Sequence, residues 1–206
     1  MPKFTAAQKN IIRFLHEAEK LKSVLRHSWL SSGRRESTAE HTWRMALMAM
    51  LLHPYLKRKP DLFKTLKMVL VHDLVEVYAG DMAIWKRVRS AKLTATKQAQ
   101  ELAAIGRLAK TLGGKQGREL KKIWLEFEAR KSPEALFAQA LDRLEVKIQH
   151  QEADVKYLTK AELRYNLVGG QKETAYDPFL AEFWLGLRDN WLLIYKKHRV
   201  SKKLYS

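Results

Sequence analysis

Cysteine is absent from the 206-residue chain, which excludes disulfide bonds and thiolate-bound metal sites. Long apolar runs are absent as well. The longest, MALMAMLL at 45–52, is far too short to span a bilayer, and the charged N-terminal segment has no apolar stretch of the kind that forms a signal peptide. We therefore expect a cytoplasmic protein with no membrane partner.

Acidic residues are scarce relative to basic ones. The chain has 22 Asp and Glu against 39 Lys and Arg, a net charge of +17. Such a charge attracts anions, whether phosphorylated metabolites, nucleic acid or acidic lipid, and does not choose among them. A basic solvated surface explains it equally well.

Residues that break helices are few, with 9 Gly and 5 Pro, and nearly every segment has apolar residues at helical spacing. No stretch alternates apolar and polar residues, and no hairpin turn signal is present. Caps at Thr5, Ser37, Asp61 and Ser132 predict helix starts. The helices are expected at about 6–21, 38–52, 62–79, 93–112, 116–130, 133–151 and 179–196. This pattern indicates an all-α fold and one domain over residues 1–206.

Two of these helices carry further expectations. The second is apolar on all sides from Met45 to Leu52 and should be central. The last is rich in aromatic residues, and Trp184 and Trp191 predict a packing face or a subunit contact. Residues 197–206 are expected to form a basic tail.

Four ionisable residues interrupt the apolar segment KMVLVHDLVEVYAGDM at 67–82: His72, Asp73, Glu76 and Asp81. Burying such groups without partners costs several kcal/mol each, to order of magnitude. Successive residues of a helix are offset by about 100°, so a continuous helix places the first three on one arc. Imidazole and carboxylate together suit a divalent metal.

An adjacent His-Asp pair is weak evidence by itself, but two further positions strengthen it. His41 lies near the start of the second helix, in TAEHTWRM. Asp142 lies on an otherwise apolar stripe of the sixth helix, in FAQALDRLE, where a carboxylate needs a partner. With His72 and Asp73 they would form a site of two nitrogens and two oxygens on three helices, with room for water and a substrate oxygen.

The stretches LKSVLRHSWLSSGRRESTAEHTWRM, LVHDLVEVYAGDM and ALDRLE together resemble the HD-domain metal-dependent phosphohydrolases. They are most similar to the branch that contains the bacterial 5′-deoxynucleotidases and related HD-domain proteins. The likeness runs from about residue 20 to about 190 and is weakest between 90 and 125. It implies an HD-type helical bundle with the metal site between central helices, and a homodimer.

The resemblance also implies roles for individual residues. The residues that match the family's metal ligands are His41, His72, Asp73 and Asp142. Glu76 matches the acid that activates the attacking water; the alternative is an acid that only orients His72. The metal would be Mn, Co, Fe, Ni, Zn or Mg, and it would generate hydroxide from bound water near neutral pH.

Three further positions correspond to substrate contacts. Arg26 matches an arginine that binds the substrate phosphate, although a surface charge at a helix end is an alternative. Asp81 matches an aspartate that contacts the sugar hydroxyl, and it could also cap a following helix. His27 stands where the bacterial nucleotidases have Trp, so we expect the wall that discriminates between ribose and deoxyribose to differ here.

The resemblance therefore implies an enzyme, a metal-dependent phosphomonoesterase that hydrolyses a nucleoside 5′-monophosphate with metal-activated water. One alternative is an HD-type phosphodiesterase or pyrophosphohydrolase, but hydrolases of guanosine tetraphosphate carry HDxxED, and Val77 replaces the final aspartate here. The other is a basic nucleic-acid-binding protein with a structural metal.

Overall fold

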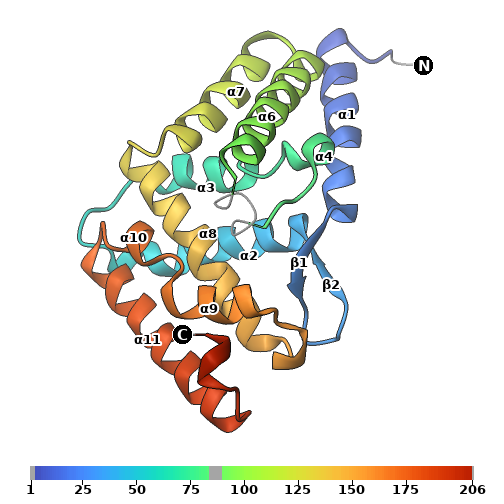
Figure 1. Ribbon diagram of the computed structural model, residues 1–206. Coiled ribbons are helices and arrows are strands. Elements are labelled where there is room, and N and C mark those ends of the chain that lie inside the picture. Colours follow the sequence, from blue (N-terminus) through green and yellow to red (C-terminus); the bar gives the residue numbers. More distant parts are fainter. Residues whose placement is uncertain (1–2, 84–89, 206) are drawn as a thin grey trace.

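The computed structural model describes residues 3–83 and 90–205 (Figure 1). The helices of this part are α1 (Ala6–Glu19), α2 (Thr38–Leu52), α3 (Leu62–Val71), α4 (Glu76–Ala79), α6 (Ala91–Leu112), α7 (Gly114–Ala129), α8 (Pro133–Glu152), α9 (Lys160–Val168), α10 (Gln171–Thr174) and α11 (Pro178–Lys197). The strands are β1 (Leu25–Trp29) and β2 (Arg35–Ser37). The all-α prediction is confirmed, with a small two-stranded sheet added. None of the described helices is both long and apolar enough to cross a membrane.

The predicted caps start their helices as expected. The Ser37 side chain accepts a hydrogen bond from the backbone of Glu40, whose carboxylate binds the Ser37 backbone in return, a complete capping box. Asp61 caps α3 in the same way, through the backbone N–H of Lys64. Local sequence therefore fixes the starts of the two helices that carry His41 and His72.

The antiparallel pair β1–β2 was not predicted. Leu25 pairs with Ser37 and Trp29 with Arg35, across a turn with Gly33 at a φ of 81°. The buried positions of β1 are Arg26 and Ser28, which are polar. Burial therefore alternates along β1 while hydrophobicity does not, so the sequence gives no signal for this strand. Arg26 lies on this strand and not at a helix end.

The predicted helix over 62–79 is interrupted. It ends at Val71, and α4 begins at Glu76. Tighter turns join the two: the N–H of Leu74 donates to the carbonyl of Val71 at 3.1 Å, and the N–H of Glu76 to that of Asp73 at 2.9 Å. Bonds between residues three apart are typical of 3₁₀ geometry, in which such residues lie above one another. Asp73 and Glu76 therefore lie one tight turn apart in the segment that follows α3.

Helix α8 occupies the centre of the bundle, in gold in Figure 1, and packs against α2, α3, α7, α10, α11 and β1. The prediction that α2 is central was only partly right. Its Met45, Met48 and Ala49 are buried, but an outer face leaves Trp43, Leu47, Met50 and Leu51 exposed. The sequence shows the total hydrophobicity of α2, whereas its position in the bundle decides which side is covered.

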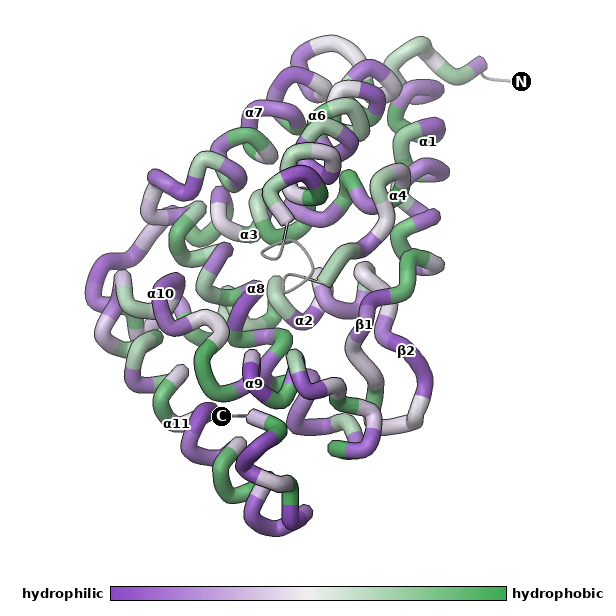
Figure 2. Tube along the Cα trace, viewed as in Figure 1, coloured by the Kyte–Doolittle hydropathy of each residue, from purple (hydrophilic) through white to green (hydrophobic). Residues whose placement is uncertain are grey.

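Two apolar clusters support the site from either side. One joins α2, α3, α8 and α11 through residues such as Met45, Met68 and Leu141. The other lies where α6 and α7 cover the segment after α3, with Leu74 and Trp124 among its members. Figure 2 shows hydrophilic and hydrophobic residues interleaved along α6 and α7, as expected for helices with one covered face.

The tryptophans of α11 pack inside the chain. Trp184 is 3% exposed and Trp191 is fully buried. Of the two predicted roles, the packing face is the one the structure supports.

Candidate active site

His72 caps the C-terminus of α3, and its ring is held by the helix itself. The Nδ1–H donates to the carbonyl of Val69 at 2.7 Å, so Nε2 carries the free lone pair. That Nε2 lies 3.0 Å from Oδ2 of Asp73. The Nε1–H of Trp124 donates to the His72 carbonyl, which fixes the end of the helix. His72 is therefore oriented before any ligand binds.

His41 lies in the second turn of α2 and is completely buried. Its Nδ1 lies 2.5 Å from Oε2 of Glu145, and Glu145 is held in turn by Arg44 at 2.7 Å. The opposite nitrogen, Nε2, lies 3.4 Å from Oδ1 of Asp142 and 3.8 Å from Oδ2 of Asp73. A metal-binding histidine usually has this arrangement: one ring nitrogen binds a carboxylate, which orients the ring so that the other nitrogen points toward the metal.

The geometry of these side chains suits a divalent metal. Nε2 of His41 and Nε2 of His72 are both buried without a hydrogen-bond partner among the described residues. Ligand atoms of His41, His72 and Asp73 lie within 4.8 Å of one another. Asp142 adds a second carboxylate, whose other oxygen is held by Arg143 at 3.1 Å. Two imidazole nitrogens and two carboxylate oxygens are good ligands for Mn, Fe, Co, Ni or Zn.

The carboxylates of this site differ sharply in pKa. Burial opposes ionisation of Asp73, but His72, then His41 and Arg26, outweigh it and lower the pKa of Asp73 to about 2. Burial likewise opposes ionisation of Asp142, whose pKa the neighbouring Arg143 and His41 lower well below its usual range. Both carboxylates are therefore charged at neutral pH, as metal ligands must be.

Glu76 is the exception. Burial, followed by the charges of Asp73 and Asp81, raises the pKa of Glu76 well above its usual range. Its Oε2 accepts a hydrogen bond from the Thr38 hydroxyl at 2.8 Å, which fixes the carboxylate. A carboxylate with a raised pKa in a cavity is typical of groups that exchange protons with a substrate or water near neutral pH.

Arg26 reaches the site from β1. It is 6% exposed, with Nε 3.2 Å from Oε2 of Glu36 and Nη1 3.3 Å from Oδ2 of Asp73. These two carboxylates hold the guanidinium in the cavity wall. The alternative of an ordinary surface charge is therefore wrong.

His27 and Asp81 lie together at the cavity wall. Nδ1 of His27 is 3.6 Å from Oδ2 of Asp81. Burial raises the pKa of Asp81, but His27 and Arg26 together outweigh it and lower the pKa below its usual value. The alternative prediction, that Asp81 caps a following helix, concerns residues 84–89 and so lies outside the described residues.

These side chains surround one cavity of about 450 Å³, within the range of small-molecule sites. Seven of the eight predicted site residues line it, namely Arg26, His27, His72, Asp73, Glu76, Asp81 and Asp142. His41 is buried behind them. The structure therefore brings all eight to one place, from α2, α8, β1 and the segment after α3.

Several site residues were not predicted. Glu145, Arg44 and Glu36 hold the histidine and arginine in place, and Thr38 holds Glu76. Gln139 lines the cavity, and its buried Oε1 has no hydrogen-bond partner among the described residues. Only Glu145 has a sequence signal, since it lies three residues after Asp142 and hence one helical turn away.

Comparisons with known proteins agree with this geometry. A family model described as HD domain matches residues 18–184. The 5′-deoxynucleotidase HDDC2 of Dictyostelium discoideum is 33% identical over 150 residues, which are 69% of this chain and 77% of that protein. The human 5′-deoxynucleotidase HDDC2 is 30% identical over 146 residues, covering 70% of this chain and 68% of its own length.

A solved structure is also similar. It is described as a "Predicted metal-dependent phosphohydrolase" from Magnetospirillum magnetotacticum and superposes with a TM-score of 0.74 at 32% identity. The superposition covers 89% of this chain and 94% of that one. Sequence, architecture and site geometry agree, and the chain belongs to the HD-domain family.

Proposed function

We propose that this chain is a metal-dependent phosphohydrolase that hydrolyses a nucleoside 5′-monophosphate to nucleoside and inorganic phosphate. The observation that carries the proposal is that Nε2 of His41 and Nε2 of His72 are buried with no hydrogen-bond partner among residues 3–83 and 90–205. They lie at a cavity that His72, Glu76 and Arg26 line. The similarity to proteins named 5′-deoxynucleotidase supports the choice of substrate.

The metal would be held by His41, His72, Asp73 and Asp142. When bound, it supplies Lewis acidity for water activation and for neutralising phosphoryl charge. Glu76 takes the proton of the attacking water, because burial and the charges of Asp73 and Asp81 raise its pKa and so make it a stronger base than an ordinary carboxylate. The water oxygen bonds to phosphorus and the bond from phosphorus to the 5′ oxygen breaks. That oxygen takes up the proton that Glu76 removed, which returns Glu76 to its ionised form.

Arg26 and Asp81 would position the substrate. The guanidinium of Arg26, held by Glu36 and Asp73, offers donors that match two phosphate oxygens. Asp81 would accept a hydrogen bond from a sugar hydroxyl, and its lowered pKa keeps it an acceptor. His27 would form the neighbouring wall, so this pair would decide between ribose and deoxyribose.

The test is phosphate release from a panel of ribo- and deoxyribonucleoside 5′-monophosphates, with Mn, Co, Mg or no metal added. We expect metal-dependent release from one sugar class, and no release from Glu76→Gln. Release that is equally fast without metal, or unchanged in Glu76→Gln, would contradict the proposal.

If no nucleotide of the panel releases phosphate, the two alternative functions are favoured. A diester or pyrophosphate substrate would then be hydrolysed, or nucleic acid would be bound with an affinity that falls steeply as salt rises. The native metal is not fixed by this donor set. The cytoplasmic location and the homodimer stay predictions.

A further inference from the structure

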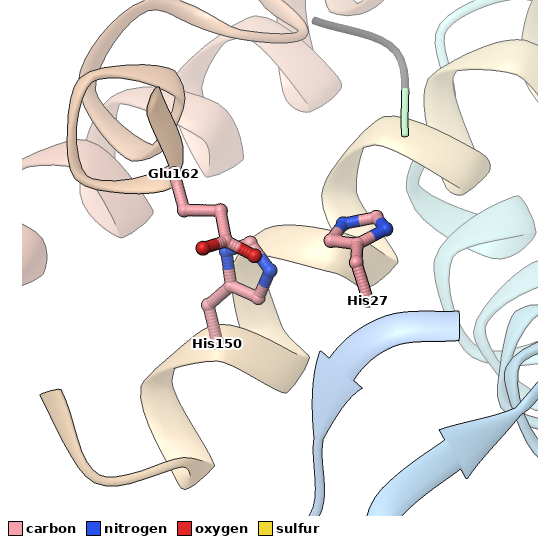
Figure 3. Close-up of side chains that lie close together, drawn as sticks. All are labelled: His27, His150 and Glu162. Carbon is pink, nitrogen blue, oxygen red and sulfur yellow. The ribbon is translucent and has the colours of Figure 1, made fainter. Parts of the chain in front are cut away.

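A second histidine cluster lies beside the cavity, on its β1 side. His27 of β1, His150 near the end of α8 and Glu162 of α9 offer ligand atoms within 4.8 Å of one another. This is the same spacing that His41, His72 and Asp73 satisfy. Figure 3 shows the two imidazoles and the carboxylate facing a common space, with one ring nitrogen of His27 on the side of His150 and Glu162.

His150 is oriented like the histidines of the active site. It is completely buried, and its Nδ1–H donates to Oδ1 of Asn166 at 2.8 Å. Within the part of the chain that the structure describes, its Nε2 has only a long contact, 3.4 Å, to the hydroxyl of Ser28. Burial, and then the neighbouring His27, lower the pKa of His150 to about 3. The ring is therefore neutral at physiological pH and keeps a lone pair on Nε2, as a metal ligand requires.

Glu162 supplies a buried carboxylate. It is 3% exposed, and its Oε2 accepts the backbone N–H of Thr159 at 2.6 Å within a capping box. Among the described residues, no Lys or Arg forms an ion pair with it within 4 Å. A buried carboxylate without a cationic partner is costly, and a bound cation would supply that partner.

A third cluster of similar spacing shows what sets this one apart. Glu36, His41 and Glu145 also lie close together, but their carboxylates are already paired with Arg26 and Arg44. Those arginines already supply the positive charge that a bound cation would bring to that cluster. The cluster of His27, His150 and Glu162 has the ligands without the arginines.

We propose that His27, His150 and Glu162 bind a second divalent transition-metal ion, of the Zn, Co or Ni class, with water completing its coordination. Two imidazole nitrogens and one carboxylate oxygen are a ligand set that such ions accept. The hydrogen bond to Asn166 would hold His150 in the ligating tautomer.

The second ion would also act on the cavity through His27. A metal on one ring nitrogen leaves the other as an N–H donor, and Nδ1 of His27 faces Asp81 at 3.6 Å. Loading the site would therefore orient Asp81. This consequence rests on the proposed function, whereas the metal site itself does not.

The experiment is a metal count on the full-length, tag-free chain, equilibrated with Zn or Co and freed of excess ion. Wild type should hold two ions per chain, and Glu162→Gln and His72→Ala one each. Glu162→Gln is the sharper variant, because the amide keeps the size of the side chain and an oxygen for the Thr159 N–H while it removes the charge. Chelator competition should show at least about tenfold weaker binding of one ion in Glu162→Gln, since even outer-shell changes can cost that much.

Two control variants distinguish the second site from adventitious metal binding and from the metal site of the proposed reaction. His198→Ala, at an exposed histidine after α11, should keep both ions. Combining Glu162→Gln with His72→Ala should leave none. One ion per chain in wild type would overturn the second site. So would two ions in Glu162→Gln that are bound as tightly as in wild type, in a variant with a native circular dichroism spectrum. Since the count does not depend on turnover, failure of the proposed reaction would leave this result intact.

Discussion

His41 and His150 are both fully buried imidazoles, yet their environments move their pKa values in opposite directions. Burial alone lowers both. At His41, the carboxylates of Glu145 and Asp142 overcome burial and the charge of Arg26, and they raise the pKa to about 10. At His150, His27 adds to the effect of burial and the amide of Asn166 only partly offsets it, so the pKa falls to about 3.

The difference shows that the neighbours of a buried histidine decide its charge. The region around His41 is rich in carboxylates and attracts any cation, a proton included, so a metal there has to displace a proton. The His150 ring is already neutral at physiological pH, so an ion that binds there displaces no proton from it. Both regions present oriented histidines, but only the first combines them with Glu76 and Arg26 around an open cavity.

The largest expected effect on activity comes from removing a metal ligand of the region around His41 while the cluster around His150 is left intact. His72→Ala removes a metal ligand. The rate of phosphate release should fall by roughly 10³-fold or more, because both water activation and charge neutralisation depend on the ion. The ion at the second cluster should remain. Parallel assays of phosphate release and metal content check this, and full turnover in His72→Ala would contradict it.

Glu76→Gln tests the proton-transfer group without touching the ligands. We expect kcat to fall by about 10²- to 10⁴-fold, the usual range for a general base, with metal content unchanged. The amide can still accept the hydrogen bond from Thr38, so the fold should be preserved. Steady-state kinetics with metal analysis measure both quantities; loss of metal in this variant would instead make Glu76 a ligand.

Arg26→Lys should have a smaller effect. The ammonium keeps the charge but loses the planar pair of donors, and we expect kcat/KM to fall by roughly one to two orders of magnitude, or about 1.4–2.8 kcal/mol. Arg26→Ala should lower kcat/KM further, since it removes the positive charge as well and leaves buried Glu36 with only a 3.8 Å contact to Arg44. Equal kinetics for Lys and Arg at this position would show that no bidentate contact is made.

The smallest expected effect concerns stability and sharpens the comparison directly. His150 is neutral in the folded chain down to about pH 3, whereas in the unfolded chain it binds a proton below about pH 6.5. The unfolded state therefore holds more protons in this window, and stability falls as pH falls. Between pH 7.5 and 5.0 the contribution is about 2 kcal/mol.

Denaturant titrations in chelator check this contribution. His150→Gln should lose less stability between the two pH values than wild type does, whatever its stability at pH 7.5. His41, with a raised pKa, contributes stability that is present at low pH and is lost only as pH rises toward 10. An identical pH dependence in His150→Gln and wild type would contradict the assignment.

The sequence was informative where the signal is local. The caps at Ser37 and Asp61 and the spacing around His72 depend on neighbours a few residues away, and they were sufficient to predict the helices that carry the site. The residue types at His41 and Asp142 suggested the long-range set, and the resemblance then matched it to the family's metal ligands. The break after Val71 was missed, because the apolar pattern continues through it.

Long-range polar contacts were beyond the sequence. Nothing in the chain indicates that Arg26 pairs with Glu36, or that His27 meets His150 more than a hundred residues away. The strand that carries Arg26 and His27 was missed for a related reason: its buried positions are polar, and they have partners far away in the sequence, such as Asp73 for Arg26 and His150 for Ser28.

The most direct test of the account is to measure metal content and phosphate release on the same samples of wild type, Asp142→Ala and Glu76→Gln. The account predicts metal with turnover in wild type, loss of one ion and of turnover in Asp142→Ala, and full metal without turnover in Glu76→Gln. Turnover retained by an Asp142→Ala protein that has lost one ion would contradict it.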